Sequence, residues 1–377
     1  MGFYRKPGLA AALLLLAGCA TATGEAPTRP TATVTAPAPA PAPGPSQPSP
    51  APDPAAPSGL PGPQTLAGWA DEDHLAAFQA YAGTCRVARE ALAALRCEEA
   101  QTIGRTSRPV TPSVARAFFE RGFGVVAAET SDGRPGLMTA YFAPEYTARR
   151  APDGPFDTPV LARPEGWTRG QILPERATIE AGPPPSPPLA WMRAEDLFFL
   201  QIQGSGYLTF EDGTTARAAY AADNGRPFTG IARPMADRGL LPADGTSGDA
   251  IRAWLAAHRG AEARAITALN PRYIFFSLDP DDGGEPAGAA GVPLPARRAI
   301  AVDPTSWAYG DLVWISADAG TLTGARHGYR GLVIALDTGS AIRGPVRADL
   351  YIGRGEAAGA EAGVVRHPLR MWRLVPR

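Results

Sequence analysis

The chain has 377 residues and a formal net charge of −1, a near-neutral balance that gives no electrostatic basis for binding nucleic acid. Its only lysine is Lys6, which excludes a P-loop lysine, a Schiff base and a Ser–Lys dyad from everything after the N-terminus. The chain has four histidines, which are His74, His258, His327 and His367. No two of them are at metal-ligand spacing, so we expect no metal and no other cofactor.

Residues 1–18 have the pattern of a secretory signal that ends at a lipidation site. Two basic residues precede an apolar stretch at 9–17, which is too short to span a bilayer. Residues 16–19 read LAGC and resemble the bacterial lipobox, which implies cleavage before Cys19 and lipidation of that residue. The alternative is an ordinary secretory signal with a chance cysteine. Because Ala20 rather than an aspartate follows, the resemblance implies an outer-membrane lipoprotein that faces the periplasm.

Residues 19–64 form a segment rich in proline and alanine. Of the chain's 41 prolines, 14 lie between residues 20 and 64. Such a segment cannot bury a core and favours an extended polyproline conformation. At about 3.1 Å per residue it predicts a tether on the order of 100 Å between a lipid anchor and the folded body. The remaining residues, 65–377, are enough for two domains.

Cys85 and Cys97 are the two cysteines of the folded part. The stretch between them has helical periodicity, and a continuous helix would separate their Cα atoms by about 18 Å. A disulfide needs Cα atoms within about 7 Å, so bonding requires a break in that helix. An even number of cysteines in an oxidising compartment favours the bond. We therefore predict a disulfide with a structural role.

Helical patterns are few, and short β-like runs dominate the rest of the chain. The helical patterns lie at 69–97, 111–121, where Thr111 provides an N-cap, and 247–269, where Gly260 should separate two helices. The β-like runs are 136–144, 196–210, 272–278, 298–303, 311–317, 331–337, 348–353 and 371–376. Many short strands with turn signals predict a mainly β fold built from barrels or sandwiches.

Asp337 and Asp349 lie twelve positions apart in the C-terminal β runs. Residues 337–340 read Asp-Thr-Gly-Ser, which would suit an aspartic protease, but the chain lacks a second such motif to supply the partner carboxylate. Either aspartate alone could be a turn residue that hydrogen-bonds its own backbone. The sequence around Ser205 lacks the glycine spacing of a nucleophile elbow, so an acyl-transfer serine is not supported.

Eight segments, in order, resemble the membrane-bound lytic murein transglycosylase A family, glycoside hydrolase family 102. They are 138–150, 173–182, 199–213, 224–231, 270–276, 291–304, 335–353 and 370–374. The resemblance covers nearly all of residues 110–377. Its last three segments resemble the family's C-terminal three-aspartate module, with Asp303, Asp337 and Asp349 at the aspartate positions.

The resemblance implies a mainly β, two-domain fold with a few N-terminal helices. Residues 65–143 and 273–377 would form a double-psi β-barrel catalytic domain. Residues 144–272 would form a second β-barrel domain inserted into the first, with a groove between the two.

The resemblance also implies a reaction. Members of this family cleave the β-1,4 bond between N-acetylmuramic acid (MurNAc) and N-acetylglucosamine (GlcNAc) in peptidoglycan, and they form 1,6-anhydro-MurNAc without water. The motif assigns the general acid and base to Asp349, beside apolar neighbours such as Leu350 and Tyr351. Asp337 would hold Asp349 through a hydrogen-bonded network and favour its protonated form by charge repulsion. Asp303 would support the barrel, and the expected substrate-binding residues are Thr139, Tyr141, Gln203 and Ser205.

The expected partners are peptidoglycan glycan strands and, through the lipid anchor, a membrane. We expect a monomer that binds no nucleic acid, and membership of cell-wall enzyme complexes stays open. The rival hypothesis is a peptidoglycan-binding lipoprotein without catalytic activity, built on the same barrel. Such a protein would be expected to lose the acid, whereas both aspartates are present.

Overall fold

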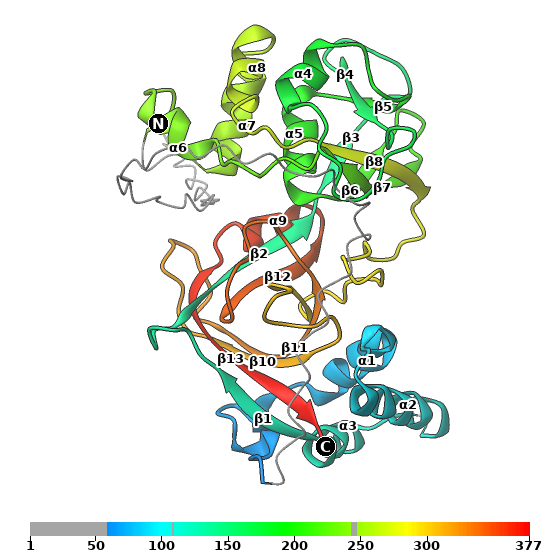
Figure 1. The fold of residues 1–377 in the computed structure, drawn as a ribbon, viewed down its shortest axis with the longest axis vertical. Helices are drawn as coiled ribbons and strands as arrows, with labels where there is room; N and C mark the ends of the chain where they lie inside the picture. The colour runs from blue at the N-terminus through cyan, green and yellow to red at the C-terminus, as the bar shows by residue number, and fades with distance from the viewer. Residues whose placement is uncertain (1–58, 108, 243–246) are drawn as a thin grey trace, which may run out of the picture.

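The computed structural model describes residues 59–107, 109–242 and 247–377. The expected signal peptide, the lipidation site at Cys19 and the tether up to residue 58 lie outside the described residues. Three parts follow one another along the long axis of the molecule, namely a group of N-terminal helices, a β-barrel and an inserted domain (Figure 1). None of the helices in the described part of the chain is both long and apolar enough to cross a membrane.

Six strands close into the barrel. The order is β13-β10-β11-β9-β12-β2, and β2 pairs back onto β13, so that each of the six has a neighbour on both sides. A seventh strand, β1, pairs with β13 outside this ring. The seven strands are β1 (Phe123–Ala128), β2 (Gly136–Ala143), β9 (Ala299–Ala301), β10 (Leu312–Ala317), β11 (Tyr329–Asp337), β12 (Arg347–Arg354) and β13 (Arg366–Pro376). Helix α9 (Gly355–Ala362) connects β12 to β13.

The two faces of the barrel strands are both apolar but pack differently. One apolar cluster takes alternate residues from all six strands, Met138 and Leu350 among them, and therefore fills the barrel. The other cluster joins the opposite face, for example Trp314, to the N-terminal helices. Because Leu350 points into the barrel, its neighbours Asp349 and Tyr351 point outward.

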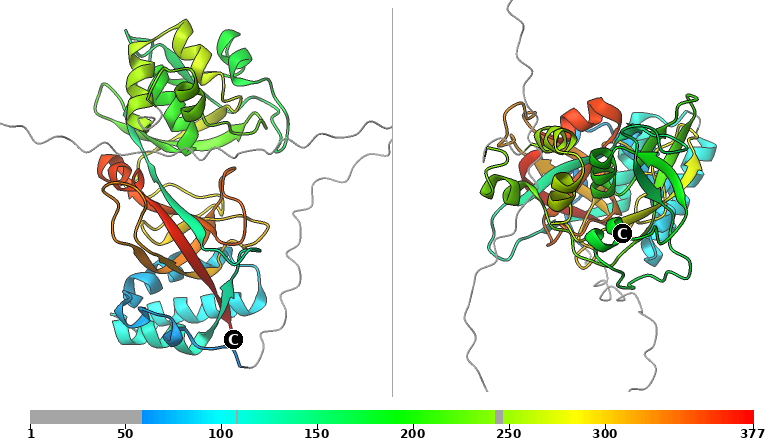
Figure 2. Two further views of the ribbon diagram at one scale, coloured as in Figure 1. Left: turned by 90° about the vertical axis from the view of Figure 1, so that its left-hand side faces the viewer. Right: turned by 90° about the horizontal axis from the view of Figure 1, so that it is seen from above.

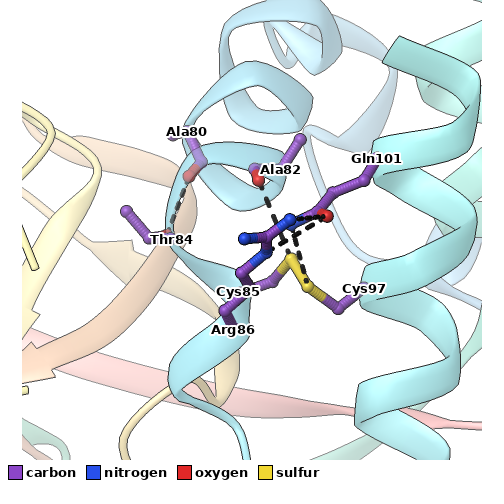
Figure 3. Close-up of a disulfide and its surroundings, with 7 residues drawn as sticks. All are labelled: Ala80, Ala82, Thr84, Cys85, Arg86, Cys97 and Gln101. Carbon is purple, nitrogen blue, oxygen red and sulfur yellow. Dashed lines mark hydrogen bonds between the residues drawn. A yellow bond between two sulfur atoms is a disulfide. The ribbon is translucent and has the colours of Figure 1, made fainter. Parts of the chain in front are cut away.

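The N-terminal helices are α1 (His74–Thr84), α2 (Ala91–Thr106) and α3 (Pro112–Gly122). The helical pattern expected at 69–97 is interrupted, because a short 3-10 turn at Cys85–Val87 ends α1 and the Glu90 side chain caps the start of α2. This break brings Cys85 and Cys97 to a Cα–Cα distance of 5.5 Å, and the two side chains form a disulfide (Figure 3). The bond ties the end of α1 to the first half of α2.

The inserted domain, called the insert below, has a four-stranded sheet in the order β3-β6-β7-β8 and a β4-β5 pair. Its strands are β3 (Glu145–Thr147), β4 (Thr158–Leu161), β5 (Pro188–Met192), β6 (Gly206–Thr209), β7 (Thr215–Asp223) and β8 (Ile274–Pro280). Its helices are α4 (Arg176–Ala181), α5 (Ala194–Gln203), α6 (Ala232–Asp237), α7 (Gly248–Ala257) and α8 (Ala261–Thr267). Since β8 pairs with β7, the sheet of the insert extends past residue 272 to Pro280.

The β-like run expected at 196–210 is wrong in its first half, where the structure has helix α5. Residues 197–201 are all buried, so this apolar run lacks the one-sided periodicity that distinguishes a helix from a buried strand. Gly204 then ends the helix in the left-handed region with a φ of 85°. The strand β6 begins only at Gly206. Elsewhere the expected features hold, because Thr111 caps α3 and Gly260 separates α7 from α8.

Two chain crossings join the barrel to the insert, from β2 into β3 and from β8 back to β9 (Figures 1 and 2). Arg354 at the end of β12 reinforces this junction. Its guanidinium donates to Glu145 at 2.8 Å and to Asp281 at 2.8 Å, and it lies 3.6 Å from the centroid of the Tyr207 ring. At the opposite end of the barrel, the carbonyl oxygen of Pro61 accepts a 2.9 Å bond from Val125 N–H. The last residues of the expected tether therefore contact the barrel beside β1, at the end away from the insert.

Candidate active site

Strand register brings Asp337 and Asp349 to one part of the barrel surface. Ala301 on β9 is the partner of Asp337 on parallel β11 and also of Asp349 on antiparallel β12. Neighbouring strands lie about 4.8 Å apart, so the two aspartate Cα atoms are on the order of 10 Å apart. On its other side, Asp349 pairs with Thr139 of β2. Four adjacent strands thus carry Thr139, Asp349, Ala301 and Asp337 side by side.

Asp349 receives a hydrogen bond from Thr139, which is itself held by an arginine. The Thr139 hydroxyl donates to Oδ1 of Asp349 and accepts from Nη2 of Arg347 at 2.9 Å. The other terminal nitrogen of Arg347 donates to the carbonyl oxygens of Ala348 at 2.6 Å and Leu137 at 3.4 Å. Arg347 stands two residues before Asp349 and so projects from the same face of β12. The result is a donor chain that runs from the guanidinium through the hydroxyl to the carboxyl group.

The environment of Asp349 favours its protonated form. Burial raises the pKa of Asp349 above its usual value, and the charge of Asp337 adds to the rise, while Arg347 and Thr139 act in the opposite direction. Of the two apolar neighbours expected from the sequence, only Tyr351 lies on this face, since Leu350 points into the barrel. The rise in pKa therefore comes from the surrounding body of the protein and from the second carboxyl group.

Asp337 is held by three donors. The Tyr141 hydroxyl donates to Oδ2 at 2.7 Å, and the backbone N–H groups of Ala289 and Thr338 each donate to Oδ1 at 2.9 Å. Burial raises the pKa of Asp337, and these three bonds act against that rise. Within the described residues, no hydrogen bond joins the Asp337 and Asp349 side chains. The interaction that the structure shows between them is electrostatic, since the charge of Asp337 acts to raise the pKa of Asp349.

A third carboxylate lies behind Tyr141. The rings of Tyr141 and Tyr351 are 5.3 Å apart between centroids, and the Tyr351 hydroxyl donates to Oε2 of Glu285 at 2.5 Å. Burial raises the pKa of Tyr141, and the charge of Asp337 adds to this, so the phenol stays a neutral donor. Glu285 and Ala289 both belong to the connection from β8 to β9, so the crossing between the two domains takes part in fixing the aspartate region.

The other expected residues lie in different places. Gln203 ends α5 and Ser205 lies just before β6, where Tyr207 N–H donates to the carbonyl oxygen of Pro144 at the end of β2. Within the described residues, neither makes a hydrogen bond to the aspartates. Asp303 accepts bonds from the N–H groups of Thr305 at 3.0 Å and Gly344 at 2.7 Å. Although burial acts to raise it, these bonds hold the pKa of Asp303 below its usual value, which suits a role in holding two loops of the barrel together.

Sequence reasoning missed Arg347, Glu285 and Ala289. The spacing of two between Arg347 and Asp349 on a strand was the available signal, because it places both side chains on one face. Glu285 and Ala289 gave no local signal, since they lie in a Gly- and Pro-rich connection that only the tertiary fold brings to Asp337. In the part of the chain that the structure describes, no cluster of three or more His, Cys, Asp or Glu side chains could hold a metal ion.

Comparison with known proteins gives consistent matches over the folded part. Residues 137–277 match the family described as the MltA specific insert domain, and residues 298–375 match the 3D domain. The chain is 35% identical over 264 residues to membrane-bound lytic murein transglycosylase A of Vibrio cholerae, which covers 67% of this chain and 69% of that protein.

Solved structures show the same architecture. MltA from Neisseria gonorrhoeae superposes with a TM-score of 0.73 at 26% identity, covering 84% of this chain and 92% of that one. MltA of Escherichia coli with bound chitohexaose superposes with a TM-score of 0.64 at 27% identity, covering 82% and 90%. Together with the closed six-stranded barrel, these matches confirm the expected fold class, which is mainly β and two-domain with a double-psi barrel.

Proposed function

The chain belongs to the membrane-bound lytic murein transglycosylase A family and is a peptidoglycan lytic transglycosylase, and we propose that it works with Asp349 as its single general acid and base. The bond cleaved is the β-1,4 bond between MurNAc and GlcNAc. The product on the MurNAc side is a 1,6-anhydro sugar.

The observation that carries this proposal is the asymmetric environment of Asp349. Its Oδ1 is held by Thr139, whereas Oδ2 receives no hydrogen bond from the described residues. Burial and the neighbouring Asp337 raise the pKa of Asp349 and so favour its protonated form. One oxygen is therefore fixed, and the other is available to a substrate on the outward face of the barrel.

In the first half of the reaction, protonated Asp349 gives its proton to the glycosidic oxygen as the bond from this oxygen to C1 of MurNAc breaks. The C6 hydroxyl of the same MurNAc attacks C1 and forms the C1–O6 bond. Because the nucleophile belongs to the substrate, the enzyme needs no second carboxylate to activate water or to form a covalent intermediate.

In the second half, the Asp349 carboxylate takes the proton released by the C6 hydroxyl and returns to its starting form. No water is consumed. Arg347 and Thr139 stabilise the carboxylate during the interval in which it is charged, through the donor chain that ends on Oδ1. Because Arg347 and Thr139 act to lower the pKa of Asp349, against the effect of burial, Asp349 can act first as the acid and then as the base.

The alternatives account less well for the hydrogen bonds. An aspartic protease needs two carboxyl groups about 3 Å apart that share one proton, whereas each aspartate here has its own donors. A glycosidase with two catalytic carboxylates needs a second one that is free to react, yet Asp337 accepts three hydrogen bonds. A non-catalytic wall-binding protein would have no need for a carboxyl group with a raised pKa.

A groove between the barrel and the insert would bind the glycan strand. Thr139 and Tyr141 would lie on its barrel side, and Gln203 and Ser205 would lie on its insert side, where α5 meets the end of β2. The chitohexaose bound to MltA of Escherichia coli supports a glycan strand as the ligand.

The described end of the tether supports a membrane-anchored arrangement. Relatives are named as membrane-bound, and we infer that Cys19 carries the lipid, at the outer membrane and facing the periplasm. The chain enters the barrel beside β1, at the end away from the insert (Figure 1). A tether on the order of 100 Å from that point would let the groove work at a distance from the membrane.

Digestion of purified murein sacculi tests this function. Wild-type protein should release muropeptides with 1,6-anhydro-MurNAc ends, identified by mass spectrometry, and few reducing MurNAc ends. Asp349→Asn should release neither, while still sedimenting with sacculi. Reducing ends as the main product would contradict the transglycosylase reaction, and no product at all from wild type would favour the wall-binding protein.

A further inference from the structure

A cavity of about 510 Å³ lies beside α9, and neither of the two aspartates lines it. We call it the α9 cavity. Its lining includes Arg297, Arg326, Ile352, Gly353, Ala358 and Glu361. Helix α9 lies at the end of the barrel that faces the insert (Figures 1 and 2). The Glu145 carboxylate of β3 lies next to Gly355, so the start of α9 touches the domain junction.

The charges in this cavity are held in a fixed arrangement by one carboxylate. Glu361, whose side chain is 12% exposed, accepts from both terminal nitrogens of Arg297, from Arg326 at 3.1 Å and from the Tyr329 hydroxyl at 3.0 Å. Although burial acts to raise it, these bonds hold the pKa of Glu361 below its usual value, so the carboxylate stays charged. Two guanidinium groups share one carboxylate, which leaves the cluster with a net charge of +1.

Arg326 carries that excess charge toward solvent. Its side chain is 58% exposed, and within the described residues it makes one hydrogen bond, from Nη2 to Glu361. The remaining N–H groups are free to donate to a ligand, and a guanidinium already oriented by a carboxylate loses less freedom when it binds an anion. Arg354 also lines the cavity, but its donors are taken by Glu145 and Asp281. The small residues Gly353 and Ala358 line the cavity together with Arg326.

The aspartate region cannot hold an anion in this way. Asp337, Asp349 and Glu285 contribute three carboxyl groups there, and the guanidinium of Arg347 is turned to Thr139 and to two backbone carbonyl oxygens. A negatively charged part of the substrate would be repelled near the acid. The α9 cavity offers an exposed cation, Arg326, and its edge is reached along β12, since the lining residue Gly353 lies four residues beyond Asp349, or about 13 Å between Cα atoms.

That distance fits a substituent of the polymer that the protein acts on. In peptidoglycan, MurNAc carries a short peptide with free carboxylates, and an extended peptide of four residues spans up to about 14 Å. We propose that the α9 cavity binds a carboxylate of the peptide attached to MurNAc, with Arg326 as the residue that contacts it. This proposal rests on the proposed function, because it assumes that the strand is placed with its MurNAc at Asp349.

The test compares two forms of one substrate. Glycan strands are prepared with their peptides, and a second portion is treated with an amidase that removes the peptides from MurNAc. Full-length protein is assayed on both, and the KM ratio of peptide-bearing to peptide-free strands is the readout. Wild type is compared with Arg326→Gln, with Arg326→Lys as the charge-conserving variant, and with Arg121→Gln on α3 as an exposed arginine at the far end of the molecule.

Arg326→Gln should raise this ratio about tenfold, because one hydrogen bond to a charged group is lost only with the peptide-bearing strand. Arg326→Lys should bring the ratio most of the way back to the wild-type value, and Arg121→Gln should leave it at that value. An unchanged ratio in Arg326→Gln, or an equal rise in KM on both substrates, would overturn the proposal.

Failure of the proposed function would appear differently, as a wild-type protein that cleaves neither substrate. In that case the same ratio is measured as a dissociation constant with fluorescently labelled strands. Weaker binding of peptide-bearing strands by Arg326→Gln, with peptide-free binding as in wild type, would support the cavity without the reaction. Equal binding of both strands by wild type and Arg326→Gln would remove the cavity proposal as well.

Discussion

The end of β11 and the middle of β12 flank β9 and each carry one aspartate, yet the two carboxyl groups are held differently. Asp337 accepts from Tyr141, Ala289 and Thr338, which use both of its oxygens. Among the described residues, Asp349 accepts a hydrogen bond from Thr139 alone, and that hydroxyl links it to the Arg347 guanidinium. A carboxyl group with both oxygens fixed is suited to a stationary charge. One with a free oxygen is suited to moving a proton.

The two aspartates also differ in whether they contact the connections between the barrel and the insert. Asp337 is bound by the β8–β9 connection through Ala289, so the position of the insert affects the fixed carboxylate. Asp349 is bound within the barrel, through β2 and its own strand. The proton carrier therefore depends on the barrel alone, whereas its electrostatic neighbour depends on both domains.

The largest expected effect separates the two aspartates directly. Asp349→Asn should lower kcat on sacculi by the upper end of the 10²–10⁴-fold that general acid catalysis typically contributes, or by more, since the same group also acts as base. Asp337→Asn, the matched control, should lose activity on the order of tenfold, because it removes a charge and not the proton donor. Release of soluble muropeptides measures both. Equal losses in the two variants would contradict the distinction drawn here.

Thr139→Val should come next, with a loss of roughly 10- to 100-fold in kcat. Valine keeps the shape of threonine but removes the hydroxyl that bonds Asp349 and accepts from Arg347, a hydrogen bond to a charged group. Thr139→Ser keeps the hydroxyl and should retain most of the activity. The pair of variants, assayed together with unfolding temperatures, distinguishes loss of the bond from loss of the fold. Similar activity in both variants would mean that the hydroxyl does not position the acid.

A smaller effect is expected on the pH dependence. Catalysis needs protonated Asp349, so kcat/KM should fall as pH rises through its pKa. Arg347→Gln removes a positive charge that lowers this pKa, so the alkaline limb should move to higher pH. Asp337→Asn removes a charge that raises it, and the limb should move to lower pH. Shifts in the same direction for both variants would contradict the electrostatic account.

The smallest expected effect on activity is that of Cys19→Ser, because Cys19 belongs to the tether and not to the surroundings of either aspartate. The variant should cleave isolated sacculi at the wild-type rate, because the tether separates the anchor from the catalytic body. It should nevertheless leave the membrane fraction and appear in the soluble fraction, as detected by immunoblot after centrifugation. A variant that still sediments fully with membranes would argue against the lipid anchor.

Much of the barrel could be predicted from local sequence, because its strands are short apolar runs that end at Gly, Pro or Asp. The run at 348–353 lies within β12, which extends one residue further at each end. That the strands close into a barrel followed from the resemblance to a known family and could not be predicted from periodicity. The run at 196–210 failed because a helix buried on all sides has no polar face to show its period. Cys85 and Cys97 could be paired only by assuming a break that the helical pattern did not indicate.

The site was predicted where the residues lie on strands and missed where they lie on connections. Thr139 and Tyr141 alternate on β2 and both reach an aspartate, as the spacing of two on a strand allows. Glu285 and Ala289 come from a segment whose place is decided by the packing of two domains. Arg347 could have been found from its spacing to Asp349, but its bond to Thr139 depends on a strand more than two hundred residues earlier.

The most direct test of the central claim is a carboxyl-carbon NMR titration of Asp337 and Asp349, assigned with the two asparagine variants. The account predicts that Asp349 titrates well above the ordinary aspartate value of about 3.9, and that its pKa falls when Asp337 is replaced by asparagine. An Asp349 that titrates at the ordinary value, or whose pKa is unchanged in Asp337→Asn, would contradict its assignment as the protonated acid beside a fixed charge.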